Sequence, residues 1–167
     1  MKEIGIFYGS TMGETEEAAE MIADVIGKDK AEVYNVGSVT VDEVEKYDKL
    51  IFGSSTWGLG ELQDDWDTFI EKLKTLDLSN KKVALFGLGD QAMYSDTFVD
   101  AMGIIYDVVK EKGAEVIGGV LADDYDFNHS EALINDAFVG LPLDNNSQGD
   151  LTEERIRNWV DDLLKAF

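Results

Sequence analysis

The sequence is poor in the residues that form cross-links and bind metals. Its 167 residues contain no Cys, one Pro and one His. Without cysteine the chain has no disulfide and no thiolate ligand for a metal. The one histidine, His129, lies in a polar segment, and no pattern of Ser, His and Asp or of metal ligands accompanies it. The sequence therefore predicts no catalytic residues and no metal ligands.

Two acidic segments begin like calcium-binding loops and then depart from that pattern. A twelve-residue calcium loop needs Gly at its sixth position and Glu at its twelfth. The segment that begins at Asp124 has His129 and Asn135 at these positions, and the segment that begins at Asp144 ends on Arg155. We interpret both segments as solvated acidic surface.

Positive charge is also scarce. The chain has 14 Lys and Arg against 35 Asp and Glu, and its formal net charge is −21. Such a chain repels the phosphates of nucleic acids, and anionic membrane surfaces for the same reason. Its field would attract basic protein partners, although the charge can equally serve solubility alone.

Long hydrophobic runs are absent as well. No apolar run approaches the length of a membrane span. The N-terminus reaches an acidic residue, Glu3, before any long apolar stretch, which is unlike a signal peptide. We therefore expect a cytoplasmic protein. Because 44% of the residues are hydrophobic and the length suits one core, we expect a single folded domain over residues 1–167.

The sequence does contain an alternation of strand-like runs and amphipathic segments. Strand-like runs occupy residues 4–8, 31–35, 50–54, 83–88 and 115–120, and helical spacing of apolar residues marks 14–26, 66–73, 98–109 and 152–167. Such alternation predicts an α/β fold, a three-layer sandwich in which helices cover both faces of a parallel sheet. Five strands suit a doubly wound sheet in the order 2-1-3-4-5.

One segment interrupts the alternation. Residues 121–137 separate the fifth strand from Phe138–Leu143, which also looks like a strand. This interval is long for a loop in a compact domain. We interpret 138–143 as a continuation of the fifth strand after an inserted loop. Pro142 supports this interpretation because proline favours an edge strand, and the fifth strand is an edge in this order.

Ligands bind such sheets beyond the carboxyl ends of strands 1 and 3, where loops 9–15, 54–62 and 88–97 are expected to meet. Loop 9–15 reads G-S-T-M-G-E-T. Backbone amides and the helix dipole attract anions there, and the hydroxyls and glycines favour a close phosphate contact. The loop lacks the Lys of a nucleotide triphosphatase and the glycine spacing of a dinucleotide site. The alternative is an ordinary helix cap.

The other two loops each contain an aromatic residue. Loop 54–62 reads S-S-T-W-G-L-G-E-L and contains Trp57, and residues 88–96 read L-G-D-Q-A-M-Y-S-D and contain Tyr94. Either ring alone could pack in the core or on the surface. Two rings beside a phosphate-binding loop favour a flat ligand stacked between them.

Together these segments resemble the flavodoxin family, of the long-chain type, over essentially the whole chain. G-S-T-M-G-E-T is similar to its phosphate loop, T-W-G-L-G-E-L-Q-D-D-W to its first flavin loop, and G-L-G-D-Q-A-M-Y-S-D-T-F to its second. The inserted 121–137 segment followed by F-V-G-L-P-L-D resembles the loop that defines long chains. The resemblance implies a flavodoxin-like domain that binds flavin mononucleotide (FMN) without covalent attachment.

The resemblance also implies which residues bind the cofactor. Those for the phosphate are Ser10, Thr11, Met12, Gly13, Glu14 and Thr15; those around the ring are Thr56, Trp57, Gly58, Leu59, Gly60, Leu88, Gly89, Asp90 and Tyr94; Asn146 would lie near the ribityl chain. Trp57 and Tyr94 would cover the two faces of the ring. Three positions depart from the family pattern: Met12 replaces a usual Thr, Glu14 stands where Asn or Lys is common, and Pro142 replaces a usual Ala. We expect these to tune affinity and not to change the ligand.

By the same resemblance the protein is a low-potential one-electron carrier and not an enzyme. FMN would shuttle between its semiquinone and hydroquinone forms. The donors implied are basic-faced proteins such as ferredoxin/flavodoxin–NADP reductase or pyruvate–flavodoxin oxidoreductase, and the protein is expected to be a monomer. Because the three loops contain no Lys or Arg, the anionic reduced flavin is disfavoured and a strongly negative potential is expected.

Two details extend this expectation. Glycine adopts positive φ at little cost, so the Gly58–Leu59 peptide is a candidate to turn over on reduction, as the corresponding peptide does in flavodoxins. An acidic surface is the candidate for partner docking and comprises Asp64, Asp65, Asp67, Asp123, Asp124 and Asp126.

Two other functions are alternatives to the electron carrier. A flavodoxin-like NAD(P)H-dependent quinone reductase is the main alternative, but nothing in the sequence suggests a nicotinamide site, and the acids would repel its phosphates. A signalling receiver domain needs clustered acids after strand 1 and an Asp after strand 3, and neither Tyr8–Ser10 nor Ser54–Ser55 supplies them.

Overall fold

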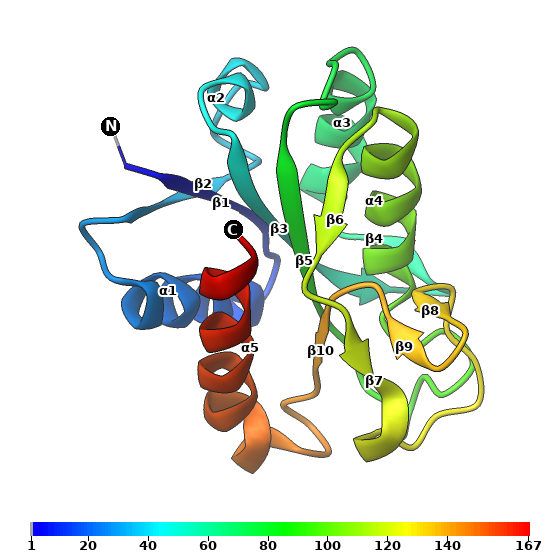
Figure 1. Cartoon of the computed structure of the whole chain (residues 1–167). Coiled ribbons are helices and arrows are strands. Elements are labelled where there is room, and N and C mark those ends of the chain that lie inside the picture. The colour runs from blue at the N-terminus through cyan, green and yellow to red at the C-terminus, as the bar shows by residue number, and fades with distance from the viewer. Residues whose placement is uncertain (1) are drawn as a thin grey trace.

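The computed structural model describes residues 2–167 and is built around a parallel β-sheet (Figure 1). Its strands are β1 (Ile4–Gly9), β2 (Ala31–Asn35), β3 (Lys49–Trp57), β5 (Lys82–Leu88), β6 (Glu115–Ile117) and β10 (Leu141–Leu143). They lie in the order β2-β1-β3-β5, and both β6 and β10 pair with β5 at the edge. With β5 as the fourth strand and β6 and β10 as the two parts of the fifth, the predicted order 2-1-3-4-5 is confirmed.

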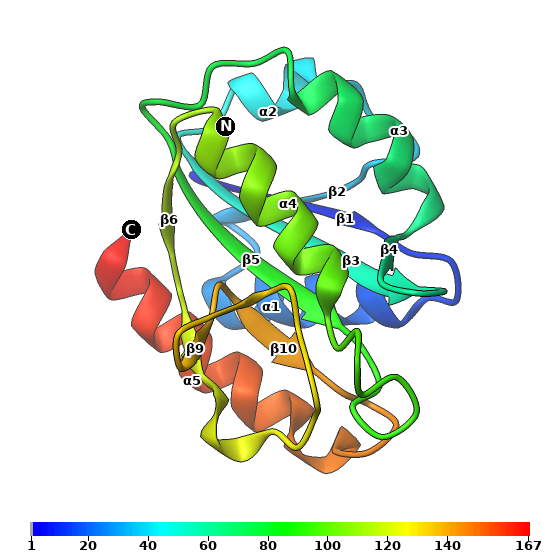
Figure 2. The same cartoon turned by 90° about the vertical axis from the view of Figure 1, so that its right-hand side faces the viewer.

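Helices cover both faces of this sheet. The helices α1 (Glu14–Ile26) and α5 (Thr152–Ala166) lie on one face, and α3 (Asp64–Leu73) and α4 (Asp100–Glu111) lie on the other (Figures 1 and 2). Neighbouring strand residues face opposite layers: Ile51 packs with the core under α1 and α5, whereas Phe52 packs with the core under α3 and α4. Because both faces are covered, β1 is buried along its whole length. The predicted three-layer sandwich is confirmed.

The inserted segment is longer than predicted. β6 ends at Ile117 and β10 begins at Leu141, so the chain leaves the sheet before residue 121 and returns after residue 137. The prediction that 138–143 continues the fifth strand is correct only for 141–143. Gly118, with φ +84, turns the chain out of the sheet in a conformation that L-residues avoid.

Within the insertion the chain builds a small antiparallel sheet of its own. Phe138 belongs to this sheet, in β9 (Ala137–Phe138), which pairs with both β7 (Val120–Leu121) and β8 (Leu133–Ile134). A short 3₁₀ helix, η1 (Ala122–Asp124), follows β7. Pro142 lies in β10 at the edge of the main sheet, as predicted.

Several short elements were not predicted. They are α2 (Asp42–Glu45), β4 (Glu61–Leu62), which pairs antiparallel with the end of β3, and the 3₁₀ helix η2 (Gly149–Leu151). The fourth main helix also begins later than predicted. Phe98 has no exposed surface and packs in the core beside Phe127 and Phe138, and α4 begins two residues later, at Asp100. The short elements α2, β4 and η2 contain too few residues for a periodic pattern, so the sequence did not predict them.

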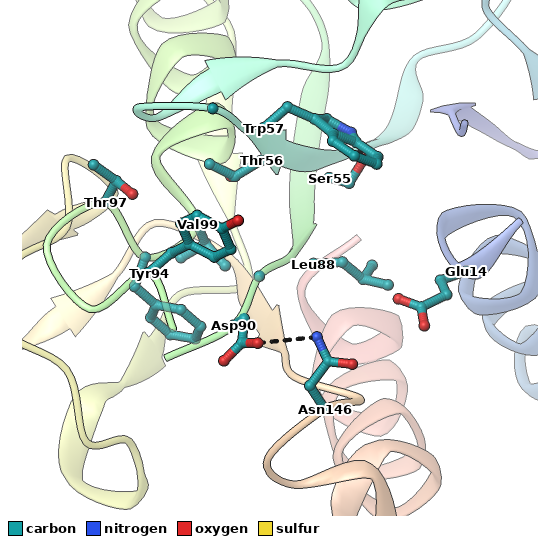
Figure 3. Close-up of a pocket in the computed structure, with 13 residues that line it drawn as sticks. Glu14, Ser55, Thr56, Trp57, Leu88, Asp90, Tyr94, Thr97, Val99 and Asn146 are labelled. Carbon is teal, nitrogen blue, oxygen red and sulfur yellow. Dashed lines mark hydrogen bonds between the residues drawn. The ribbon is translucent and has the colours of Figure 1, made fainter. Parts of the chain in front are cut away.

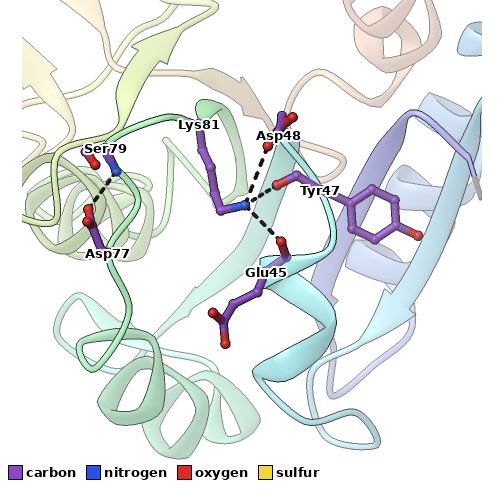
Figure 4. A network of polar contacts seen from close by, with 6 residues as sticks. All are labelled: Glu45, Tyr47, Asp48, Asp77, Ser79 and Lys81. Atoms are coloured by element: carbon purple, nitrogen blue, oxygen red, sulfur yellow. Dashed lines mark hydrogen bonds and ion pairs between the residues drawn. The ribbon is translucent and has the colours of Figure 1, made fainter.

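The amino end of the sheet is held by a buried lysine (Figure 4). The Nζ of Lys81 donates hydrogen bonds to the carbonyl oxygens of Glu45 (3.2 Å) and Tyr47 (2.5 Å), and lies 3.9 Å from Asp48 Oδ1. These contacts tie the α2–β3 connection to the start of β5. Within residues 2–167, no helix is long and apolar enough to cross a membrane.

Candidate functional site

A pocket opens at the carboxyl ends of β3 and β5, where the predicted loops meet (Figure 3). Nine predicted site residues line it: Glu14, Thr56, Trp57, Gly58, Leu88, Gly89, Asp90, Tyr94 and Asn146. Four lining residues were not predicted: Ser55, Thr97, Phe98 and Val99. Seven predicted residues do not line this pocket: Ser10, Thr11, Met12, Gly13, Thr15, Leu59 and Gly60. In the last group Thr15 is the second residue of α1, and the others lie in the loop before α1 or at the tip of the β3–β4 turn.

The loop before α1 presents an open helix end beside the pocket. Ser10 Oγ accepts a hydrogen bond from the Gly13 amide (2.9 Å), and Gly13 has φ +92. Among residues 2–167 no side chain caps α1, so its first amides remain available to an anion. Met12 is 77% exposed, so the residue that replaces a usual hydroxyl points to solvent. Thr15, by contrast, is buried.

A buried glutamine that was not predicted joins this loop to the next one. Gln63 caps α3, where its Oε1 accepts from the Asp65 amide (3.0 Å), and its Nε2 donates to Thr11 Oγ1 (3.2 Å). Gly9 passes against it so closely that an added Cβ would collide with Gln63 Oε1 and with Trp66. A glutamine is not among the preferred capping residues, so the sequence carried no signal for this role.

The loop after β3 holds its aromatic ring at the pocket wall. Trp57 is 41% exposed, and its indole N–H donates to Ser55 Oγ (2.8 Å). Thr56 Oγ1 accepts from the amide of Ala101, at the start of α4 (3.1 Å). Gly58 has φ +53 and Gly60 has φ +91, so both lie in the left-handed region that favours glycine.

The loop after β5 is a turn organised by one carboxylate. Asp90 Oδ1 accepts hydrogen bonds from the amides of Ala92 (3.1 Å) and Met93 (2.9 Å). Its Oδ2 accepts from Asn146 Nδ2 (3.1 Å), the contact drawn in Figure 3. Tyr94 closes the turn through its amide and leaves its ring 57% exposed. In this structure the Asp90 carboxylate therefore shapes the loop.

Comparison with known proteins identifies the family. The family model described as Flavodoxin matches residues 6–159. This chain belongs to the flavodoxin family. It is 44% identical to a flavodoxin of Nostoc sp., with 99% of this chain and 98% of that protein covered, and 41% identical to Flavodoxin 1 of Azotobacter vinelandii, with 100% and 98% covered.

Solved flavodoxin structures have the same fold. The flavodoxin of Fusobacterium nucleatum bound to flavin mononucleotide superposes with a TM-score of 0.94 at 33% identity, covering 100% of this chain and 99% of that one. Oxidised Flavodoxin 2 of Bacillus cereus gives a TM-score of 0.75 at 28% identity, with 99% of both chains covered. Flavodoxins are electron-transfer proteins and not enzymes, which confirms that prediction, and the quinone reductase alternative is not favoured.

A buried carboxylate lies next to Gly60, in the first flavin loop of this flavodoxin. Asp100, the first residue of α4, is buried, and its Oδ1 accepts from the Glu131 amide of the inserted segment (2.8 Å). A Cβ at Gly60 would lie 2.6 Å from its Oδ2. Burial raises the pKa of Asp100, the charge of Glu131 raises it further, and the Glu131 amide and His129 oppose the shift.

Asp100→Asn should therefore change how stability depends on pH. A carboxyl group whose pKa is raised on folding stabilises the protein below its unfolded pKa, and this contribution is lost as the pH rises through the folded pKa. Between pH 7 and pH 4 the wild type should gain unfolding free energy relative to Asp100→Asn, as measured by urea unfolding. The exposed Asp161→Asn variant is the control and should follow the wild type. Parallel curves for wild type and Asp100→Asn would contradict the prediction.

Proposed function

We propose that this flavodoxin carries single electrons on one non-covalently bound FMN in the pocket at the carboxyl ends of β3 and β5. The observation that carries the proposal is the placement of two partly exposed aromatic rings, Trp57 and Tyr94, at this pocket, next to the uncapped start of α1. A flat ring would stack on the two aromatic side chains, and a phosphate would bind at the start of the helix. The FMN-bound flavodoxin of Fusobacterium nucleatum supports the same ligand.

The residues present fit this cofactor in three groups. Ser10, Thr11, Met12, Gly13, Glu14 and Thr15 would bind the phosphate through amides and hydroxyls; Thr56, Trp57, Gly58, Leu59, Gly60, Leu88, Gly89, Asp90 and Tyr94 would surround the ring; Asn146 would lie beside the ribityl chain. When bound, FMN supplies one-electron chemistry at low potential. The protein binds and orients it, and the two aromatic rings keep water away from it.

Negative charge around the pocket should lower the reduction potential. None of the 13 described residues that line the pocket is Lys, Arg or His, and two of them, Glu14 and Asp90, are acidic. A pocket without a positive partner resists any added negative charge, since each nearby carboxylate opposes it. The net charge of −21 acts in the same direction, with salt screening as its limit.

Glu14 should weaken FMN binding. Its carboxylate lines the pocket at the first residue of α1, next to the proposed phosphate site (Figure 3). Repulsion between the Glu14 carboxylate and the FMN phosphate in a solvated site reduces the binding free energy by up to about 1 kcal/mol. Glu14→Gln should therefore tighten FMN binding about threefold to fivefold at low salt. FMN titration at 10 and 300 mM salt measures the effect, which should shrink at high salt. Glu17→Gln, on the same helix but outside this pocket, is the control. Equal dissociation constants for Glu14→Gln and wild type at low salt would refute the prediction.

Redox partner proteins follow from the family, and we propose that they present basic faces. Five large apolar side chains are exposed on the three loops: Met12, Trp57, Leu59, Met93 and Tyr94. Acidic residues follow Trp57 and Leu59 in the sequence, among them Glu61 in β4 and Asp64 and Asp65 at the start of α3. An apolar patch with an acidic rim suits transient docking of a basic redox protein such as ferredoxin/flavodoxin–NADP reductase or pyruvate–flavodoxin oxidoreductase. We further propose a monomeric, cytoplasmic protein whose residues 1–167 form one domain.

Spectroscopy of the purified protein tests the proposal. The protein should be yellow, release FMN on denaturation, and take FMN up again after its removal. Stepwise anaerobic reduction should resolve two separate one-electron potentials, the second strongly negative. A colourless protein that quenches no FMN fluorescence would overturn the proposed cofactor, and oxidation of NADPH without an added reductase would overturn the carrier role.

A further inference from the structure

The loop after β10 contains a buried carboxylate that has no part in the function proposed so far. Asp144 has no exposed surface. Its Oδ2 accepts hydrogen bonds from the backbone amide and from the Nε2 of Gln91, both at 2.9 Å. Its Oδ1 accepts from the amides of Asn146 (3.1 Å) and Ser147 (2.9 Å). All four partners are donors, which suits a carboxylate because both of its oxygens only accept.

The two hydrogen bonds from Gln91 join segments that are 53 residues apart in the sequence, whereas those from Asn146 and Ser147 lie within the loop after β10. Gln91 lies in the turn that presents Tyr94, and Asn146 donates through its side chain to Asp90, which organises the same turn. The inserted segment is connected as well, since Gln91 Oε1 accepts from the Asp126 amide (2.6 Å). Asp144 is thus the common acceptor behind the wall of the pocket that carries Asp90 and Tyr94.

We propose that Asp144 is a positioning residue that holds the Asp90–Tyr94 turn in the shape that binds FMN. The inference rests on the proposed FMN site and adds a residue outside the pocket lining. Burying a charge is unfavourable unless hydrogen bonds compensate it, and here four donors do so. The buried charge in turn fixes the direction of those donors, since each would otherwise lose its partner.

Asp144→Asn tests this role with almost no change in volume. An amide has one acceptor oxygen, so whichever way it is oriented, two of the four N–H groups lose their acceptor and face an NH₂ group. The turn must rearrange to relieve this. We expect the dissociation constant for FMN to be about tenfold higher for Asp144→Asn than for the wild type. It is measured by the quenching of FMN fluorescence when the full-length chain, freed of its cofactor, is added. Asp150→Asn, an exposed carboxylate close by in η2, is the control and should bind within twofold of the wild type.

A double-mutant cycle separates positioning from general damage. If Asp144 acts by placing the turn of Tyr94, then Asp144→Asn should raise the dissociation constant for FMN less than twofold in a Tyr94→Ala background. General destabilisation would instead cost the same factor in both backgrounds. Gln91→Met, which removes the side-chain donor to Asp144 and the acceptor for Asp126, replaces Asp144→Asn if far-UV circular dichroism shows that the latter does not fold. It should weaken binding about threefold, again only when Tyr94 is present.

The outcomes distinguish this inference from the proposed function. A wild type that takes up no FMN overturns the proposed function. A wild type that binds FMN, with Asp144→Asn within twofold of it, overturns the positioning role. Additive losses in the cycle with Tyr94→Ala overturn it too, because they assign to Asp144 a merely structural contribution.

Discussion

Tyr94→Ala should weaken FMN binding roughly 30- to 150-fold. Tyr94 lies at the pocket with its ring 57% exposed, on a turn that Asp90 holds through two backbone amides. Removing the ring deletes the apolar contact of an aromatic side chain and its stacking preference, together about 2–3 kcal/mol. At about 1.4 kcal/mol for each factor of ten, this gives the stated range. Fluorescence titration of the cofactor-free protein with FMN measures it.

Tyr94→Phe is the matched variant for this prediction. It keeps the ring and loses only the hydroxyl, so it should bind FMN within about threefold of the wild type. A similar loss for Tyr94→Phe and Tyr94→Ala would mean that the hydroxyl, and not stacking, holds the cofactor. An unchanged dissociation constant for Tyr94→Ala would remove Tyr94 from the site.

Gly140→Ala should destabilise the fold by about 3 kcal/mol or more. Gly140 brings the inserted segment back to the sheet immediately before β10, and an added Cβ would collide with the carbonyl oxygen of Leu85 in β5. That oxygen belongs to a buried strand, so the neighbour cannot move aside as a flexible side chain would. For a protein of this length, each kcal/mol lowers the melting temperature by about 2–4 °C, so a fall of about 6–12 °C is expected. Urea unfolding and thermal melts measure both quantities.

Gly149→Ala is the control for this substitution. A Cβ at Gly149 meets nothing within 4 Å, so the free energy of unfolding should change by less than about 0.5 kcal/mol. Both variants carry the same change in unfolded-chain entropy. A melting temperature for Gly140→Ala equal to that of Gly149→Ala would show that β10 can shift away from β5 at little cost.

The architecture and the three loops could be predicted from the sequence for a physical reason. Parallel strands covered on both faces must be apolar along their length, as Ile4–Tyr8 and Val83–Leu88 are, and this pattern is local. The carboxyl ends of such strands meet at one edge, so the sequence predicts that the loops that contain Gly13, Trp57 and Tyr94 lie together. Two of the three, Trp57 and Tyr94, line one pocket in the structure.

The residues at which the inserted segment begins and ends could not be predicted from the sequence. Val120 and Phe138 have the apolar character of strand residues, and they do lie in strands, but those strands pair with each other and not with β5. A short apolar run does not specify its partner. Gly118 and Gly140 decide where the chain leaves and rejoins the main sheet, through a positive φ at the first and a close approach to Leu85 at the second.

By itself the sequence determined the layer order, the position of the site edge and the family, because these follow from local periodicity and from loops with recognisable composition. Only the tertiary structure decided which polar side chains hold the loops in place. Gln63, Asp100 and Asp144 each act on partners distant in the chain: Thr11 for the first, Glu131 for the second and Gln91 for the third. A carboxylate or an amide looks the same in sequence whether it faces water or is buried among donors. What separates the two cases is burial, which depends on how the whole chain folds.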